Sequence, residues 1–226
     1  MSGSELRDAR VGKKWNQADL AGRLAVSQAY VSLLESGQRP VPERLTRKLV
    51  SVLGLPASTL PVSTESTPLP ADDVARALGS LGYSGFAHLR HARKFNPAEL
   101  LVRTLRSSNV EARLVEALPW LLVNYPRVDW QWLLREAKVN DLQNRLGFVV
   151  SVAREVAEKR GKSDAVEVLR RWESVLENSR LQKEDSFAQD ALTETERKWL
   201  RNNRSKVAAH WNLLTSMSAE TVADAF

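Results

Sequence analysis

Two short amphipathic segments, separated by a brief interruption, constrain the fold of this chain more than any other feature. In the stretch from Gln17 to Gly37, apolar residues recur at the spacing of one helical face on each side of the interruption. Ser27 precedes the second segment, where its hydroxyl can accept from free backbone N–H groups, and Gly37 follows it, where a left-handed residue commonly ends a helix. Ala21 is small enough for two helices to cross closely. The stretch therefore predicts two short helices that meet at a steep angle.

Such a pair is the core of a helix-turn-helix, whose second helix lies in the major groove of DNA. Upstream, we expect a helix from about Glu5 to Lys14, with Leu6 and Val11 facing inward. Downstream, Pro42 should stand in the first turn of a further helix, and Pro56 argues for a stop after it. The side chains expected to be buried along this further helix are Leu45, Leu49, Val52 and Leu53.

The segment from Arg10 to Leu55 resembles the DNA-binding domain of the Cro/C1-type (XRE) repressor family. The resemblance rests on residues that occur in order and at the family's spacing, namely Leu6, Arg10, Gln17, Leu20, Ala21, Val26, Ser27, Gln28, Val31, Ser32, Glu35, Gly37, Pro42 and Leu53. It covers the first quarter of the chain. It implies a lambda-repressor-like domain of four or five helices that binds double-stranded DNA as a homodimer in the cytoplasm.

The candidate base-reading residues lie in and just before the second helix of the pair, expected from Gln28 to about Ser36. Gln28 stands first, and its amide offers one donor and one acceptor, which match N7 and the N6 amino group of adenine. In the resembling family this position makes that contact. The other residues expected to set the base preference are Ser27, Ala29, Tyr30 and Ser32. Since Ala29 and Leu33 stand where relatives carry polar readers, the operator sequence stays open.

Phosphate contacts are expected beside this helix. Gln17 resembles the family glutamine that binds a backbone phosphate, and the N-terminus of its helix adds partial positive charge. Further candidates, whose alternative is a merely solvated surface charge, are Lys13, Lys14 and Arg39. The resemblance also pairs Arg10 with Glu35 as a structural ion pair that holds the second helix at its angle.

A proline-rich stretch divides the chain. Residues 56–70 carry four prolines among many serines and threonines, which cannot continue a helix or bury much surface. We therefore expect a DNA-binding domain in residues 1–55, a semi-extended linker in residues 56–70 and a helical domain for dimerisation or partner binding in residues 71–226. The last part shows helix after helix and no convincing strand, which predicts an irregular bundle or a short array of helical hairpins. The predicted fold class is all-α.

Local signals mark some of these later helices. Thr193 and Glu196 form a capping box for one last long helix. Its inward residues are expected to be Leu200, Val207, Trp211 and Leu214. Its basic residues, which form a solvated face or meet DNA or an acidic partner, are Arg197, Lys198, Arg201, Arg204 and Lys206. Trp130 and Trp132 lie two positions apart and cannot share a helical face, so one of them is a candidate for exposure to a partner.

Composition narrows the classes of function. The chain has no cysteine, which excludes disulfides and thiolate metal sites and is compatible with a reducing cytoplasm. No apolar run of about 18 residues occurs, so we expect no membrane span. The net charge of +6 permits an anionic partner without demanding one. His88 and His91 have the spacing of two metal ligands, but no third ligand is evident and their basic neighbours disfavour a cation. We expect no metal, no cofactor and no enzymatic activity.

Three functions follow from these features. The first is a sequence-specific DNA-binding repressor. The second, implied by the resemblance, is an antitoxin that neutralises a toxin through residues 71–226 while it represses its own operon. The third is a regulator that binds a small ligand between helices of residues 71–226, although no converging polar cluster indicates where.

Overall fold

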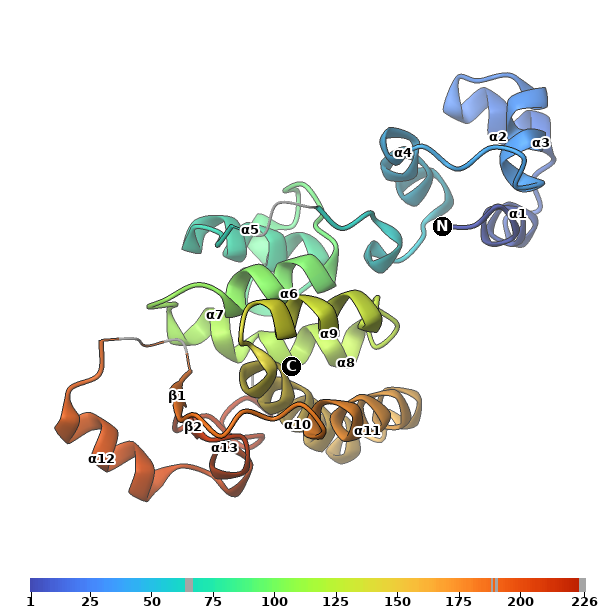
Figure 1. The fold of residues 1–226 in the computed structure, drawn as a ribbon. Coiled ribbons are helices and arrows are strands. Elements are labelled where there is room, and N and C mark those ends of the chain that lie inside the picture. Colours follow the sequence, from blue (N-terminus) through green and yellow to red (C-terminus); the bar gives the residue numbers. More distant parts are fainter. Residues whose placement is uncertain (64–66, 188, 190, 224–226) are drawn as a thin grey trace. The chain divides into compact units, whose positions relative to one another are not determined.

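The computed structural model describes residues 1–63, 67–187, 189 and 191–223. The chain divides into two compact units, Met1–Val62 and Ser63–Phe226. Both units are built almost entirely from helices (Figure 1), so the fold is all-α as predicted. Among the described residues, no helix has the length and apolar character that crossing a membrane requires.

The first unit consists of short helices, and side-chain caps set the starts of the first three. Ser2, Asn16 and Ser27 each accept a hydrogen bond from the backbone N–H three residues further on, which satisfies one free donor of each helix. The helices enclose a small core in which Leu6, Leu20, Leu34 and Leu49 are fully buried. The elements are α1 (Gly3–Gly12), α2 (Gln17–Leu24), α3 (Gln28–Glu35), α4 (Glu43–Leu53) and the 3₁₀ helix η1 (Ala57–Thr59).

Helix α1 differs from its prediction. It starts at Gly3 instead of Glu5, because Ser2 forms a capping box with Glu5. The prediction that Val11 faces inward is wrong, since its side chain is 55% exposed. The inward positions are Leu6 and Arg10, which lie four residues apart on one face, and Val11 points away from that face.

The first unit also continues past the predicted boundary at Leu55. Residues Ala57 and Leu60 are buried, and η1 packs against α4. The proline-rich stretch that the sequence favours as a linker therefore begins as part of the first unit's core.

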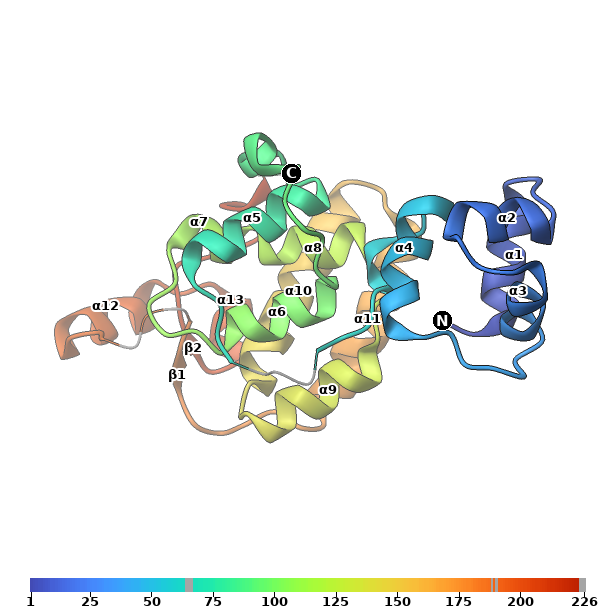
Figure 2. The same ribbon diagram turned by 90° about the horizontal axis from the view of Figure 1, so that it is seen from above.

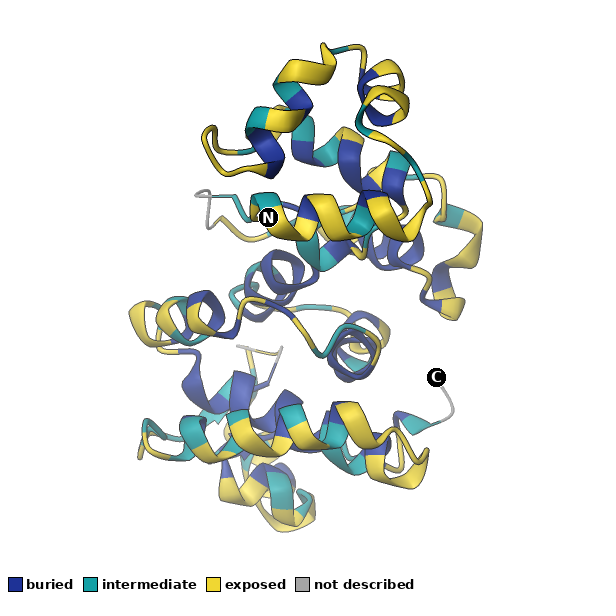
Figure 3. Cartoon of the chain, turned by 90° about the vertical axis from the view of Figure 1, so that its right-hand side faces the viewer, coloured by how far each residue is buried: buried dark blue, intermediate teal, exposed yellow. Residues whose placement is uncertain are grey.

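The second unit is organised around one helix, α10 (Gln143–Lys159). This helix is apolar on most of its circumference, with Leu146, Phe148, Val149, Val150, Val152 and Ala153 all buried, which is typical of a central helix. It packs against α8, α9, α11 and α13 (Figure 2). Figure 3 shows how buried and exposed residues alternate along the helices of the chain. The surrounding elements are α5 (Ala71–Leu81), η2 (Ser84–Leu89), α6 (Pro97–Leu105), α7 (Ala112–Glu116), α8 (Leu118–Asn124), α9 (Trp130–Val139), α11 (Ser163–Glu177), α12 (Glu194–Asn203) and α13 (Lys206–His210).

The predicted last long helix is in fact two helices. Arg204 has an extended backbone, with ψ 152°, and ends α12, after which Ser205 caps α13. The chain then leaves helical structure: β2 (Leu213–Leu214) pairs in parallel with β1 (Asp185–Ser186), so the expectation of no strand is wrong at this one short ladder. The break at Arg204 turns Trp211 onto the middle of α10, where it is fully buried.

The two tryptophans expected to differ in exposure are both buried. Trp130 stacks on Trp172 with ring centroids 5.4 Å apart, and its indole N–H donates to the carbonyl of Pro126. Trp132 is 9% exposed, because α9 packs against both α6 and α10 and is covered on two sides. The exposed tryptophan of this unit is Trp199 on α12, at 57%.

Candidate nucleic-acid interface

A tight turn sets the angle between α2 and α3. Ala25 ends α2 in the left-handed conformation, with φ 57° and ψ 49°, and its N–H donates to the carbonyls of Ala21 and Gly22. Ser27 then caps α3 by accepting from the N–H of Tyr30 at 3.2 Å. Only three residues separate the two helices, so α3 starts at once in a new direction. This is the arrangement of a helix-turn-helix.

The C-terminal end of α3 is tied to α1 by a buried ion pair. The guanidinium of Arg10 donates from Nε to Oε1 of Glu35 at 2.6 Å and from Nη2 to Oε2 at 2.9 Å. The third guanidinium nitrogen donates to the carbonyl of Trp15. The two side chains are 10% and 4% exposed. The pair is bidentate and desolvated, which is the geometry in which removing one partner is most costly.

The ion pair changes the acidity of both groups. The hydrogen bonds to Glu35 raise the pKa of Arg10. Burial by itself raises the pKa of Glu35, but the hydrogen bonds from Arg10 and Gln17 and the positive charge of Arg10 outweigh it, so the net effect lowers that pKa. Glu35 is therefore held as a carboxylate at neutral pH.

Glu35 also begins a chain of hydrogen bonds that leads to the surface. The side-chain amide of Gln17 donates from Nε2 to Oε2 of Glu35 at 3.0 Å. The side-chain oxygen of Gln17 then accepts from Nε2 of Gln28 at 2.9 Å. The direction of this chain is determined at its buried end: a carboxylate can only accept, so the NH₂ group of Gln17 must face it and the oxygen of Gln17 must face Gln28.

This chain leaves Gln28 with a defined set of free groups. Gln28 is exposed at the start of α3. One of its two amide N–H groups is used by Gln17, so a second N–H and the side-chain oxygen are available for another partner. A donor and an acceptor on one planar amide are what the major-groove edge of adenine requires.

The other predicted contact residues lie around Gln28 in two different environments. Ser27, Ala29 and Ser32 are exposed, whereas Tyr30 is half-buried against the core of the first unit. The guanidinium of Arg39 lies 5.9 Å from the centre of the Tyr30 ring, so this phenol is partly covered. The predicted phosphate-binding side chains that are exposed are Lys13, Lys14 and Arg39.

Two residues that support α3 and α2 have no role in the sequence-based prediction. A Cβ on Gly3 would lie 2.3 Å from the carbonyl oxygen of Leu34 and 2.7 Å from that of Glu35, so the backbones of α1 and α3 touch there. Lys48 donates from Nζ to the carbonyl of Leu24 at 2.8 Å and satisfies the end of α2. A glycine two residues before the predicted helix was the available signal for the first of these contacts.

The family comparison agrees with this geometry. A family model described as a helix-turn-helix domain matches residues 3–61, the segment from α1 to η1. No curated protein and no solved structure matches the chain significantly. The first unit is therefore a helix-turn-helix domain of the DNA-binding class. The matched segment ends within that unit, so it carries no information on residues 63–226.

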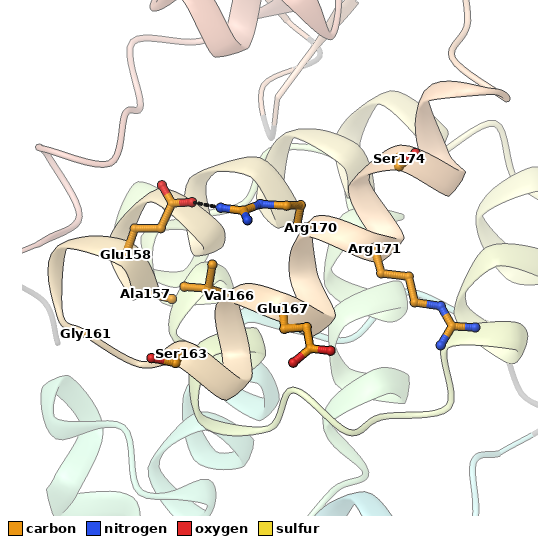
Figure 4. A pocket seen from close by; sticks show the side chains of 9 residues that line it. All are labelled: Ala157, Glu158, Gly161, Ser163, Val166, Glu167, Arg170, Arg171 and Ser174. Atoms are coloured by element: carbon orange, nitrogen blue, oxygen red, sulfur yellow. Dashed lines mark hydrogen bonds and ion pairs between the residues drawn. The ribbon is translucent and has the colours of Figure 1, made fainter.

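The second unit has a shallow groove between α10 and α11. Its wall includes small side chains, such as Ala157 and Ser163, and charged ones (Figure 4). Across it, Arg170 donates to Glu158 at 2.9 Å, so these two charges satisfy each other. Glu167 and Arg171 point away from that pair. The charges of Glu158 and Arg170 are thus compensated by each other within the groove.

Proposed function

We propose that this protein is a sequence-specific DNA-binding transcription regulator that places α3 in the major groove. The observation that carries the proposal is the exposed amide of Gln28, whose orientation is set through Gln17 by the buried carboxylate of Glu35. A side chain that is already oriented loses little conformational entropy when it binds a base edge.

The residues around Gln28 then take separate roles. Gln28 reads adenine with its free N–H and its oxygen. Gln17 uses its remaining N–H and the N-terminus of α2 for a phosphate. Phosphate contacts from Lys13, Lys14 and Arg39 add affinity and salt dependence but carry no sequence information. The protein acts as a repressor and binds as a two-fold homodimer on half-sites about one helical turn apart.

Selection of preferred duplexes from a random pool, followed by titration of the selected site, tests this proposal. Gln28→Ala should lower the affinity for the selected site by about 1–3 kcal/mol and remove the preference at one adenine, leaving binding to random duplex unchanged. Gln38→Ala is the matched control, because Gln38 is an exposed glutamine just past α3. Equal behaviour of the two variants would remove the case for base reading.

A second candidate is the antitoxin role, in which the second unit binds and neutralises a protein while the first unit represses the shared operon. The observation in its favour is Trp199, whose indole is 57% exposed on α12. Co-expression with the product of the adjacent gene should yield a complex that Trp199→Ala weakens. Val139→Ala, at a side chain 74% exposed, is the control and should leave the complex intact.

A further inference from the structure

The second unit carries a basic, exposed segment at residues 88–94 that the helix-turn-helix does not account for. We name it the basic platform and define it as His88, Arg90, His91, Arg93 and Lys94. We propose that the basic platform binds the phosphate backbone of duplex DNA, as a second contact beside the helix-turn-helix. This proposal rests on the proposed function, since it assumes that DNA is the ligand of the chain.

The charge of the platform is not compensated by its surroundings in the sequence. Residues 74–98 contain no aspartate or glutamate. All five side chains of the platform are exposed, and within the described part of the chain none of them has a hydrogen-bond or ion-pair partner. Several other arginines of this unit do have a carboxylate partner, namely those at 103, 113, 145, 154, 170 and 201. Arg90, Arg93 and Lys94 therefore place three exposed cations without a carboxylate partner, among the described residues, within five positions of the chain.

The backbone beneath the platform is held in place. A Cβ on Gly79 would lie 2.3 Å from the carbonyl oxygen of Phe86, so α5 packs directly on the backbone of η2. Tyr83 and Phe86 are 5% and 4% exposed, with ring centroids 5.7 Å apart, and they anchor η2 in the core. The hydroxyl of Ser80, which donates to the carbonyl of Ala77, lies 3.4 Å from the carbonyl oxygen of Arg93, so the far end of the platform also lies close to α5. The charges are thus presented from a packed segment.

The charged groups on the neighbouring helix α7 do not cancel the platform. The guanidinium of Arg113 lies 5.5 Å from the centre of the Phe86 ring and adds positive charge beside η2. Glu111 is paired with Arg113 at 2.8 Å. Glu116 acts on Tyr83, at the start of η2, where it raises the pKa of the phenol together with burial, the larger cause. Within α7, Glu116 is thus one carboxylate set against the three full charges of Arg90, Arg93 and Lys94.

DNA is the polyanion that suits this arrangement best. A duplex carries one phosphate charge per about 1.7 Å of axis, and each phosphate neutralised by arginine or lysine releases counterions. Once the helix-turn-helix has engaged a duplex, the same chain holds the platform at high effective concentration near that duplex. The platform then contributes affinity and salt dependence without sequence preference.

The test compares two triple variants of the full chain that lose the same charge. One is Arg90→Ala/Arg93→Ala/Lys94→Ala, and the control is Arg127→Ala/Lys138→Ala/Lys159→Ala, at exposed cations elsewhere on the second unit. Binding of long random duplex and of the selected site is measured by fluorescence anisotropy from 50 to 200 mM salt. The platform variant should lose at least about tenfold in affinity at low salt, and its salt slope should fall by up to about three. The control variant should stay close to the wild type.

The outcomes separate this inference from the proposed function. Equal losses in the two variants, or an unchanged salt slope in the platform variant, would overturn the role of the platform. So would platform-dependent binding of polyglutamate or of phosphatidylserine vesicles with DNA binding intact, which would assign the surface to a different polyanion. Gln28→Ala is measured in parallel: loss of site preference in that variant, with no effect in the platform variant, leaves the proposed function standing alone. Circular dichroism verifies that all variants are folded.

Discussion

Each unit holds an arginine–glutamate pair, buried in the first unit and partly exposed in the second, and the hydrogen bonds around the two pairs lead to different places. In the first unit, Arg10 and Glu35 orient Gln17 and, through it, the exposed amide of Gln28. In the second, Arg154 donates to Glu173, whose other carboxylate oxygen accepts from the buried hydroxyl of Ser151. The same pair of residue types thus serves the surface in one unit and the core in the other.

The inward network is built around a serine. The hydroxyl of Ser151 lies 2.6 Å from Oε1 of Glu173 and accepts from the indole N–H of Trp211 at 2.8 Å. The indole packs on Gly147, where a Cβ would lie 2.4 Å from the ring. At its inner end this network satisfies the indole N–H of a fully buried tryptophan, and at its outer end Arg154 also donates to the exposed Glu158. The comparison shows that an arginine–glutamate pair is informative about function only through what it orients.

The largest expected loss of stability comes from removing one partner of the more buried pair, Arg10 and Glu35. Glu35→Ala leaves the guanidinium of Arg10 buried without its partner and should destabilise the first unit by about 3–5 kcal/mol. Glu173→Ala should destabilise the second unit by only about 1–2 kcal/mol, because the Glu173 side chain is 24% exposed and Arg154 keeps its contact with Glu158. Hydrogen exchange on peptides from each unit measures both changes. Equal losses of stability in the two variants would contradict the idea that the deeper burial of the Arg10–Glu35 pair makes its loss more costly.

A smaller loss of stability is expected from a substitution at Gly147, on which the indole of Trp211 packs. Gly147→Ala forces a Cβ against a fully buried ring and should destabilise the second unit by about 1–3 kcal/mol. Gly22→Ala in α2 is the matched change, because no atom lies within 4 Å of the added Cβ. That variant should stabilise the first unit by about 0.5–1 kcal/mol. The comparison uses guanidinium unfolding, and effects of the same sign would argue against the packing of Trp211 on α10.

The outward network also predicts a response to acid. The pKa of Glu35 is lowered in the folded state from its ordinary value of 4.5, so the folded form binds fewer protons than the unfolded form as pH falls below that value. Its contribution to stability is therefore complete above about pH 4.5 and is lost as pH falls through the folded pKa. Glu35→Gln should flatten this part of the stability–pH curve of the first unit, as followed by hydrogen exchange. An unchanged slope would show that other carboxylates carry the acid response.

The smallest change in stability is expected from a substitution in the turn between α2 and α3. Ala25 has a left-handed backbone that costs a residue with a side chain about 1–2 kcal/mol, so Ala25→Gly should give a net gain of about 0.5 kcal/mol after the larger entropy of glycine is subtracted. Ala18→Gly, at an exposed position within α2, should instead cost about 0.5–1 kcal/mol. Thermal unfolding of the two variants checks this. A loss in both would mean that the turn is not strained.

Local chemistry explains what the sequence could predict about the fold. Asn16, Ser27 and Thr193 are caps whose partners lie three residues away, so a short window contains the whole interaction. Val11 was misplaced because the inward position of α1 is filled by Arg10, whose charge is tolerated only through a residue 25 positions away. The break at Arg204 was missed because the following segment is held by a ladder to residues 185–186.

At the candidate interface too, local features could be predicted from the sequence and contacts between distant residues could not. The base and phosphate contacts remain predictions, made one residue at a time from the pattern and the resemblance. The hydrogen bonds between Gln17, Gln28 and Glu35 span 11 and 18 positions, and they depend on the angle at which α3 leaves the turn. That angle cannot be derived from the spacing of residues in the sequence. For the basic platform, the basic composition is visible in the sequence. That its side chains are exposed and lack carboxylate partners is seen only in the structure.

Gln28 cannot be redesigned as an isolated position. Its orientation originates at Glu35, an acceptor-only group in the interior, and passes through Gln17. A library that varies residue 28 alone would present most replacements with an oxygen of Gln17 that they cannot satisfy. Changing the preferred operator therefore calls for joint randomisation of positions 17 and 28, with residue 35 kept as glutamate.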